Sequence, residues 1–212
     1  MEGPQEKSND ILAKFNAIPD DQKERFGHIL NDILQRITNV EERLKADDLG
    51  TASGYAYSGF QFLIGAQFIN DAGFKDLQYK AATIAYRIVL DCIKREVDQD
   101  DLELEMSVTH TLIKTATNAQ DENYPTLSKL RKECVALWDK ARQIAIEKHE
   151  EIGDFQKAKA EIHAKIKPLV TEFLKKISSD EIFEMDVYQE LDGLKAEAEE
   201  ILRFLPVPKT KD

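Results

Sequence analysis

The sequence predicts an all-α protein, a helical bundle of about seven or eight helices. Apolar residues recur at intervals of three and four along most of its 212 residues, the spacing that gives a helix one apolar face. A single short stretch alternates apolar and polar residues, and no second one is present to pair with it as a strand. We expect one elongated bundle or two adjoining helical subdomains, residues 1–98 and 99–205, followed by a flexible tail at 206–212.

Composition and charge narrow the class of protein. With 42% hydrophobic and 33% charged residues, 9 Gly, 6 Pro and 2 Cys, the chain is unlike collagen-like, disulfide-framework or low-complexity proteins. Its formal net charge of −11 would repel a phosphate backbone, so we expect no nucleic-acid partner. We read no secretory signal and no apolar run long enough for a stable membrane anchor, and therefore expect a cytoplasmic protein.

The N-terminal region predicts a short amphipathic helix at residues 10–18, ended by Pro19, and then one long helix from Asp20 or Asp21 to Leu44. The long helix carries an apolar stripe with heptad-like spacing. Such a stripe is typical of an ordinary bundle helix, and also of a helix that pairs with a second copy of the chain. The candidate self-association stripe consists of Phe26, Leu30, Ile33, Ile37, Val40 and Leu44.

The next region changes in composition twice. Residues 46–54 collect Gly, Ser, Thr and Asp without periodicity, which predicts a loop. Residues 55–74 are rich in aromatic side chains and predict a buried helix, which a neighbour approaches closely at Gly59 and Gly65 and which ends at Ala72-Gly73. Its aromatic residues form either the centre of the core or the lining of a pocket for an apolar ligand or a partner helix. The candidates are Tyr55, Tyr57, Phe60, Phe62 and Phe68.

The middle of the chain predicts a central helix and then an ambiguous segment. Residues 75–97 have two apolar faces, one through Ile84 and Ile88 and the other through Tyr86 and Val89, so both sides of this helix are expected to pack. An acidic turn follows at residues 98–101. Residues 102–112 fit both a strand and a helix, and we predict a helix because an isolated strand would leave its backbone groups unpaired.

The C-terminal half predicts three more helices. The first opens at residues 123–126 and runs to about Glu151, and the second covers residues 155–177 after a break at residues 153–154. Pro168 should kink or split the second of these. The last begins at the polar run 178–180, extends through Leu205 and is stopped by the two prolines that follow.

Charge is distributed unevenly among these last helices. Residues 123–178 contain 12 Lys or Arg against 8 acidic residues, whereas residues 180–200 contain 9 acidic residues against Lys195 alone. Opposite charge favours a position for the last helix beside the two basic ones. The alternative is that these are simply solvated faces of mixed sign.

The usual chemical motifs are absent. None of the four histidines follows a glutamate by three positions, as a di-iron bundle requires, and no phosphate-binding glycine pattern or G-x-S-x-G occurs. Cys92 and Cys134 stand in apolar helical stripes, which is typical of reduced packing residues. The run GDFQKA at residues 153–158 is similar to the inter-helix turn of a tetratricopeptide repeat, but no second copy appears at that family's period. We therefore predict no catalytic, cofactor-binding or metal-binding residues.

These observations favour a non-catalytic helical interaction or scaffold module that binds another protein or itself. The alternative is a carrier of a fatty acid or another apolar small molecule in an aromatic-lined cavity of the bundle. A third hypothesis is an enzyme whose active-site residues are dispersed along the chain.

Overall fold

The computed structural model describes residues 4–99, 125–178 and 181–204, and within these ranges it confirms the all-α fold. The described residues form nine helices, and α4 and α9 are single short turns, which accounts for the excess over the predicted number. The helices are α1 (Pro4–Ala17), α2 (Asp20–Lys45), α3 (Leu49–Ile64), α4 (Gln67–Asp71), α5 (Lys75–Gln99), α7 (Pro125–Ile152), α8 (Phe155–Ile177), α9 (Glu181–Glu184) and α10 (Val187–Leu202).

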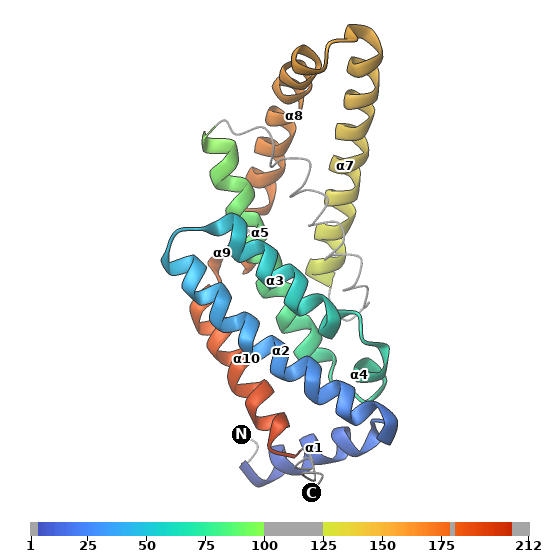
Figure 1. Cartoon of the computed structure of the whole chain (residues 1–212), viewed down its shortest axis with the longest axis vertical. Coiled ribbons are helices and arrows are strands. Elements are labelled where there is room, and N and C mark those ends of the chain that lie inside the picture. Colours follow the sequence, from blue (N-terminus) through green and yellow to red (C-terminus); the bar gives the residue numbers. More distant parts are fainter. Residues whose placement is uncertain (1–3, 100–124, 179–180, 205–212) are drawn as a thin grey trace, which may run out of the picture.

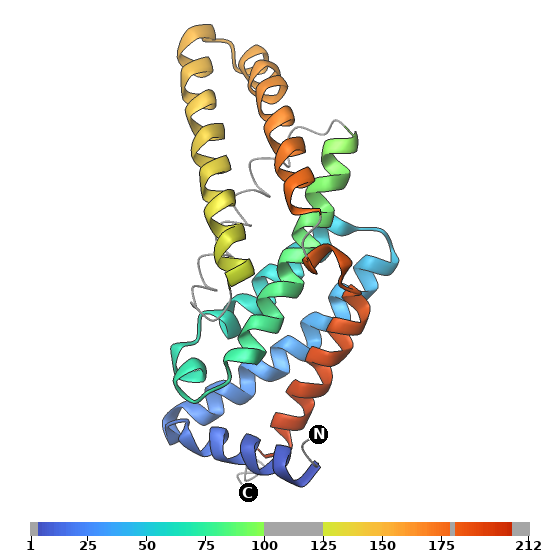
Figure 2. The ribbon, with the colours of Figure 1, turned by 180° about the vertical axis from the view of Figure 1, so that it is seen from behind.

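The architecture is a bundle with a helical hairpin extending from one end. Helices α2, α3, α5 and α10 pack together as the bundle, and α1 crosses its lower end (Figure 1). Helices α7 and α8 pack against each other, and α8 joins the pair to α5. Seen from behind, the α7–α8 hairpin again extends beyond the bundle, at the end opposite α1 (Figure 2).

Helix α5 lies at the centre of the bundle, as its two apolar faces predicted. It packs against α3, α10 and α8. Ile84, Ile88, Tyr86 and Val89 are all fully buried, two from each predicted face. A helix with two apolar faces is stable only when both are covered, and here neighbours on different sides cover them.

The predicted self-association stripe on α2 is part of the chain's own core. Phe26, Leu30, Ile33, Ile37 and Val40 are each fully buried, and Leu44 packs against the same core. The helices that cover α2 are α3 and α10. The stripe is therefore occupied within one chain, and these side chains are not available on the surface to pair with a second copy.

Two predictions between residues 46 and 74 were wrong. The loop is only three residues long, because the Asp48 side chain accepts a hydrogen bond from the Thr51 N–H (3.2 Å) and so starts α3 at Leu49. The predicted single helix of residues 55–74 is divided into α3 and α4. Gln78 of α5 stabilises this break, since its side-chain amide donates to the carbonyl oxygens of Leu63 (3.0 Å) and Ala66 (3.1 Å).

The last predicted helix is also divided. Asp186 accepts hydrogen bonds from the N–H groups of Tyr188 (3.0 Å) and Gln189 (3.3 Å), and this cap starts α10 after the short α9. Helix α8, by contrast, runs without interruption through Pro168, so the predicted split does not occur. The alternative that Pro168 kinks α8 stays a prediction, as does the helix at residues 102–112, which lies outside the described ranges.

The position of α10 differs from the one its charge predicted. It packs mainly against α2 and α5, which belong to the predicted N-terminal subdomain, rather than beside the basic α7 and α8. Leu191, Leu194, Ala198 and Ile201 on one face of α10 are buried there. Burial of this apolar face outweighs attraction between exposed charges, which contributes at most about 1 kcal/mol for each pair. The predicted division of the chain between residues 98 and 99 stays a prediction.

Candidate functional site

The candidate aromatic residues do not line one common pocket. Phe60 is fully buried in the core, whereas Phe62, two positions later on α3, is 62% exposed. Tyr55 and Phe68 are half-buried, and a guanidinium lies over each ring, that of Arg36 and that of Arg25 respectively. The side chain of Tyr57 lies outside the described part of the structure. Phe60 and Phe62 lie on different sides of α3, and Phe68 lies on α4, which explains this separation.

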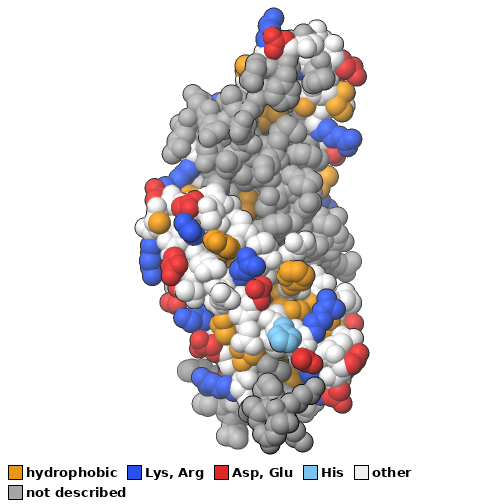
Figure 3. All heavy atoms as spheres, in the orientation of Figure 1, with side chains coloured by type: hydrophobic (Ala, Val, Ile, Leu, Met, Phe, Trp, Pro, Cys, Tyr) orange, Lys and Arg blue, Asp and Glu red, His pale blue; other side chains and the backbone are white. Residues whose placement is uncertain are grey.

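On the face of the molecule shown in Figure 3, hydrophobic side chains of the bundle lie in small groups among charged side chains of both signs. The more distinctive surface lies on the α7–α8 hairpin. An open groove with a volume of about 470 Å³ lies along α8, and its lining residues are described below. Sequence reasoning did not identify this groove.

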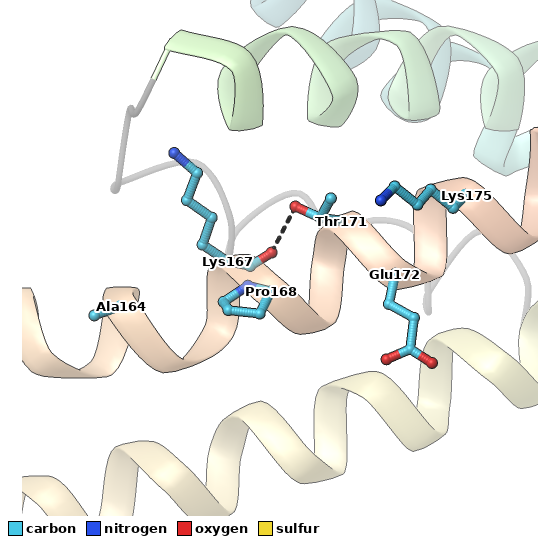
Figure 4. Close-up of a pocket in the computed structure, with 6 residues that line it drawn as sticks. All are labelled: Ala164, Lys167, Pro168, Thr171, Glu172 and Lys175. Atoms are coloured by element: carbon cyan, nitrogen blue, oxygen red, sulfur yellow. Dashed lines mark hydrogen bonds between the residues drawn. The ribbon is translucent and has the colours of Figure 1, made fainter.

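The floor of the groove consists of small or rigid side chains. Ala164, Pro168 and Thr171 lie along it (Figure 4). Proline has no N–H, so the carbonyl oxygen of Ala164 receives no helical hydrogen bond from position 168. The Thr171 hydroxyl donates to the carbonyl oxygen of Lys167 (2.8 Å), which keeps this polar group satisfied within the helix.

Charged side chains border the groove on both sides. Lys167 extends toward α5, Lys175 runs along α8, and Glu172 extends toward α7 (Figure 4). One carboxylate oxygen of Glu172 lies 3.8 Å from the Lys176 ammonium nitrogen.

Ion pairs hold the two helices of the hairpin together near their connecting turn. The Lys148 ammonium binds Glu151 on α7 and lies 3.8 Å from a carboxylate oxygen of Glu161 on α8. Hydrogen bonding to Glu151 raises the pKa of Lys148, and the same contact lowers the pKa of Glu151. Gly153 has a φ of +62°, a left-handed conformation that glycine adopts without steric cost. The turn therefore returns the chain directly onto α7.

The described side chains of helix α7 are all at least partly exposed. Among its residues whose side chains are described, none is fully buried, and Ile146 is 43% exposed. Within the described part of the chain, its main packing partner is α8. Several side chains of the central α5, by contrast, are fully buried, among them Ile84, Tyr86 and Ile88. The described side chains of α7 are therefore in contact with solvent.

A charged cluster at the junction of α5 and α9 connects the two helices. The Arg87 Nε lies 3.1 Å from the Asp91 Oδ2 one helical turn away, and the Arg87 guanidinium stacks over the Phe183 ring at 4.7 Å. Burial raises the pKa of Asp91, an effect that Arg87 and the nearby Lys94 and Arg95 counteract. The contact between Arg87 and Phe183 holds α9 against α5.

The described residues contain no group of three or more His, Cys, Asp or Glu side chains placed to hold a metal ion. His28 lies exposed, with its Nε2 atom 3.8 Å from Glu24, and the side chains of the other three histidines fall outside the described part. No described helix combines the length and apolar character needed to cross a membrane.

Comparison of the chain with models of protein families, with curated proteins and with solved structures found no match in any of the three. The class is therefore defined by the fold and the surface alone. It is a helical bundle with a helical hairpin that extends from one end and carries a groove along α8.

Proposed function

We propose that this chain is a non-catalytic helical interaction module that binds another protein, or a second copy of itself, through the α7–α8 hairpin. The observation that carries this proposal is the contrast in burial between the described side chains of α7 and those of the bundle. The largest core side chains of α5 are fully buried, whereas no described side chain of α7 is. Helix α8 anchors the hairpin in the core through Ile166, Val170, Phe173 and Leu174, and the partly exposed side chains of α7 are placed to contribute contacts to a partner.

The charge of the hairpin supports the same role. Residues 125–178 carry 12 basic and 8 acidic residues, a net charge of +4, in a chain whose net charge is −11. A region of opposite sign to the rest of the molecule favours one orientation of approach and accelerates encounter with an acidic surface. The partner proposed here is therefore acidic where it meets the hairpin.

Photo-crosslinking at matched positions tests the proposal. Ile146 on α7 and Leu12 on α1 are large apolar side chains of nearly equal exposure, 43% and 41%, at opposite ends of the molecule. Each is replaced in turn by a photoreactive amino acid in the full chain, which is irradiated in an extract of the cells that produce it. We expect protein adducts heavier than the 24.2 kDa chain to form several-fold more from position 146 than from position 12.

Equal yields from the two positions would contradict the role of the hairpin. A native mass spectrum of the same purified protein tests the carrier hypothesis separately. Extra mass in the small-molecule range that disappears on denaturation would favour a carrier over an interaction module.

A further inference from the structure

We draw no further inference here: the strongest candidate, the exposed face of α3 that carries Phe62 together with the small residues Gly54 and Ser58, is a surface patch, and nothing among the described residues shows what covers it.

Discussion

Gly59 illustrates how one missing methyl group positions two helices. A Cβ atom at this position would lie 2.4 Å from Cγ and 2.7 Å from Cβ of Arg36 on α2, which is closer than van der Waals contact allows. Gly54, on the same helix, has no atom within 4 Å of the corresponding position. The close approach of α2 therefore requires a glycine at position 59, whereas no neighbouring atom requires one at position 54.

Substituting alanine at the two positions should change stability in opposite directions. Gly59→Ala is expected to lower the free energy of unfolding by about 1–3 kcal/mol, because α3 and α2 must separate to accommodate the methyl group. Gly54→Ala should raise it by about 0.5–1 kcal/mol, because alanine favours the helix at an open site. Urea denaturation of the two variants measures both values. A loss of stability at Gly54 as large as at Gly59 would contradict the close approach of α2.

Asp48 makes the stability of α3 sensitive to acid. Hydrogen bonds from Thr51 to its carboxylate lower the pKa of Asp48 below the ordinary value of 3.8. Since the unfolded chain then binds a proton more readily than the folded one, this contribution is complete above the ordinary pKa and is lost as the pH falls below it. Stability falls with falling pH because the folded state stabilises the charged form of the Asp48 carboxylate.

The variant Asp48→Asn removes the charge at the start of α3 and keeps a side chain that can cap the helix. Asparagine caps helices about as well as aspartate but does not titrate. We expect the difference in free energy of unfolding between the wild type and the variant to be constant above about pH 5. As the pH falls to about 3.5, the wild type should lose stability relative to the variant. Denaturation curves over this range measure it. A difference that is independent of pH would show that the Asp48 carboxylate has the same pKa in both states.

At the scale of elements, single side chains decide where helices begin. Apolar periodicity continues across residues 180–202, and it predicted one helix there. The Asp186 cap instead starts a new helix, and the change of direction lets α10 lay its apolar face on α2 and α5. Apolar periodicity predicts which residues share one face of a helix, whereas capping side chains determine where a helix begins.

Removing the cap should affect α10 specifically. Asp186→Ala is expected to lower the free energy of unfolding by about 0.5–2 kcal/mol, because the N–H groups of Tyr188 and Gln189 lose their acceptor. Asp192→Ala, on the exposed face of the same helix, should change it by less than about 0.5 kcal/mol. Thermal and urea unfolding of both variants provide the comparison. Equal effects would exclude capping as the cause of the helix break.

At the scale of the whole molecule, stability should be concentrated in the bundle. Leu194 of α10 is fully buried, whereas Ile146 of α7 is 43% exposed. Leu194→Ala is expected to lower the free energy of unfolding by about 2–5 kcal/mol, because it leaves a cavity between α10 and its neighbours. Ile146→Ala should lower it by less than about 1 kcal/mol.

Chemical denaturation of these two variants tests the assignment of α10 to the bundle and of α7 to the surface. A loss at Ile146 comparable to that at Leu194 would mean that α7 is a core element. Amide hydrogen exchange gives an independent measure, since α7, whose described side chains are all at least partly exposed, should exchange faster than the central α5.

The sequence by itself determined the fold class and much of the core. Periodicity of three and four identified α2 and its stripe, the central α5, and the helices of the hairpin to within a few residues. It also identified Gly59 as a point of close approach. These features follow from the order of residues along one helix, which the sequence states directly.

Only the tertiary structure decided which helix covers which face. The stripe on α2 could have paired with another copy, and packing of α3 and α10 onto it assigns it to the core. The distribution of charge predicted a position for α10 beside the hairpin. In the structure, α10 instead buries its apolar face on α2 and α5. The groove on α8 also depends on where α5 and α7 lie, and the only local signal for it was Pro168 between lysines. The burial of a side chain depends on all of its neighbours in the fold, so the sequence of one segment does not determine it.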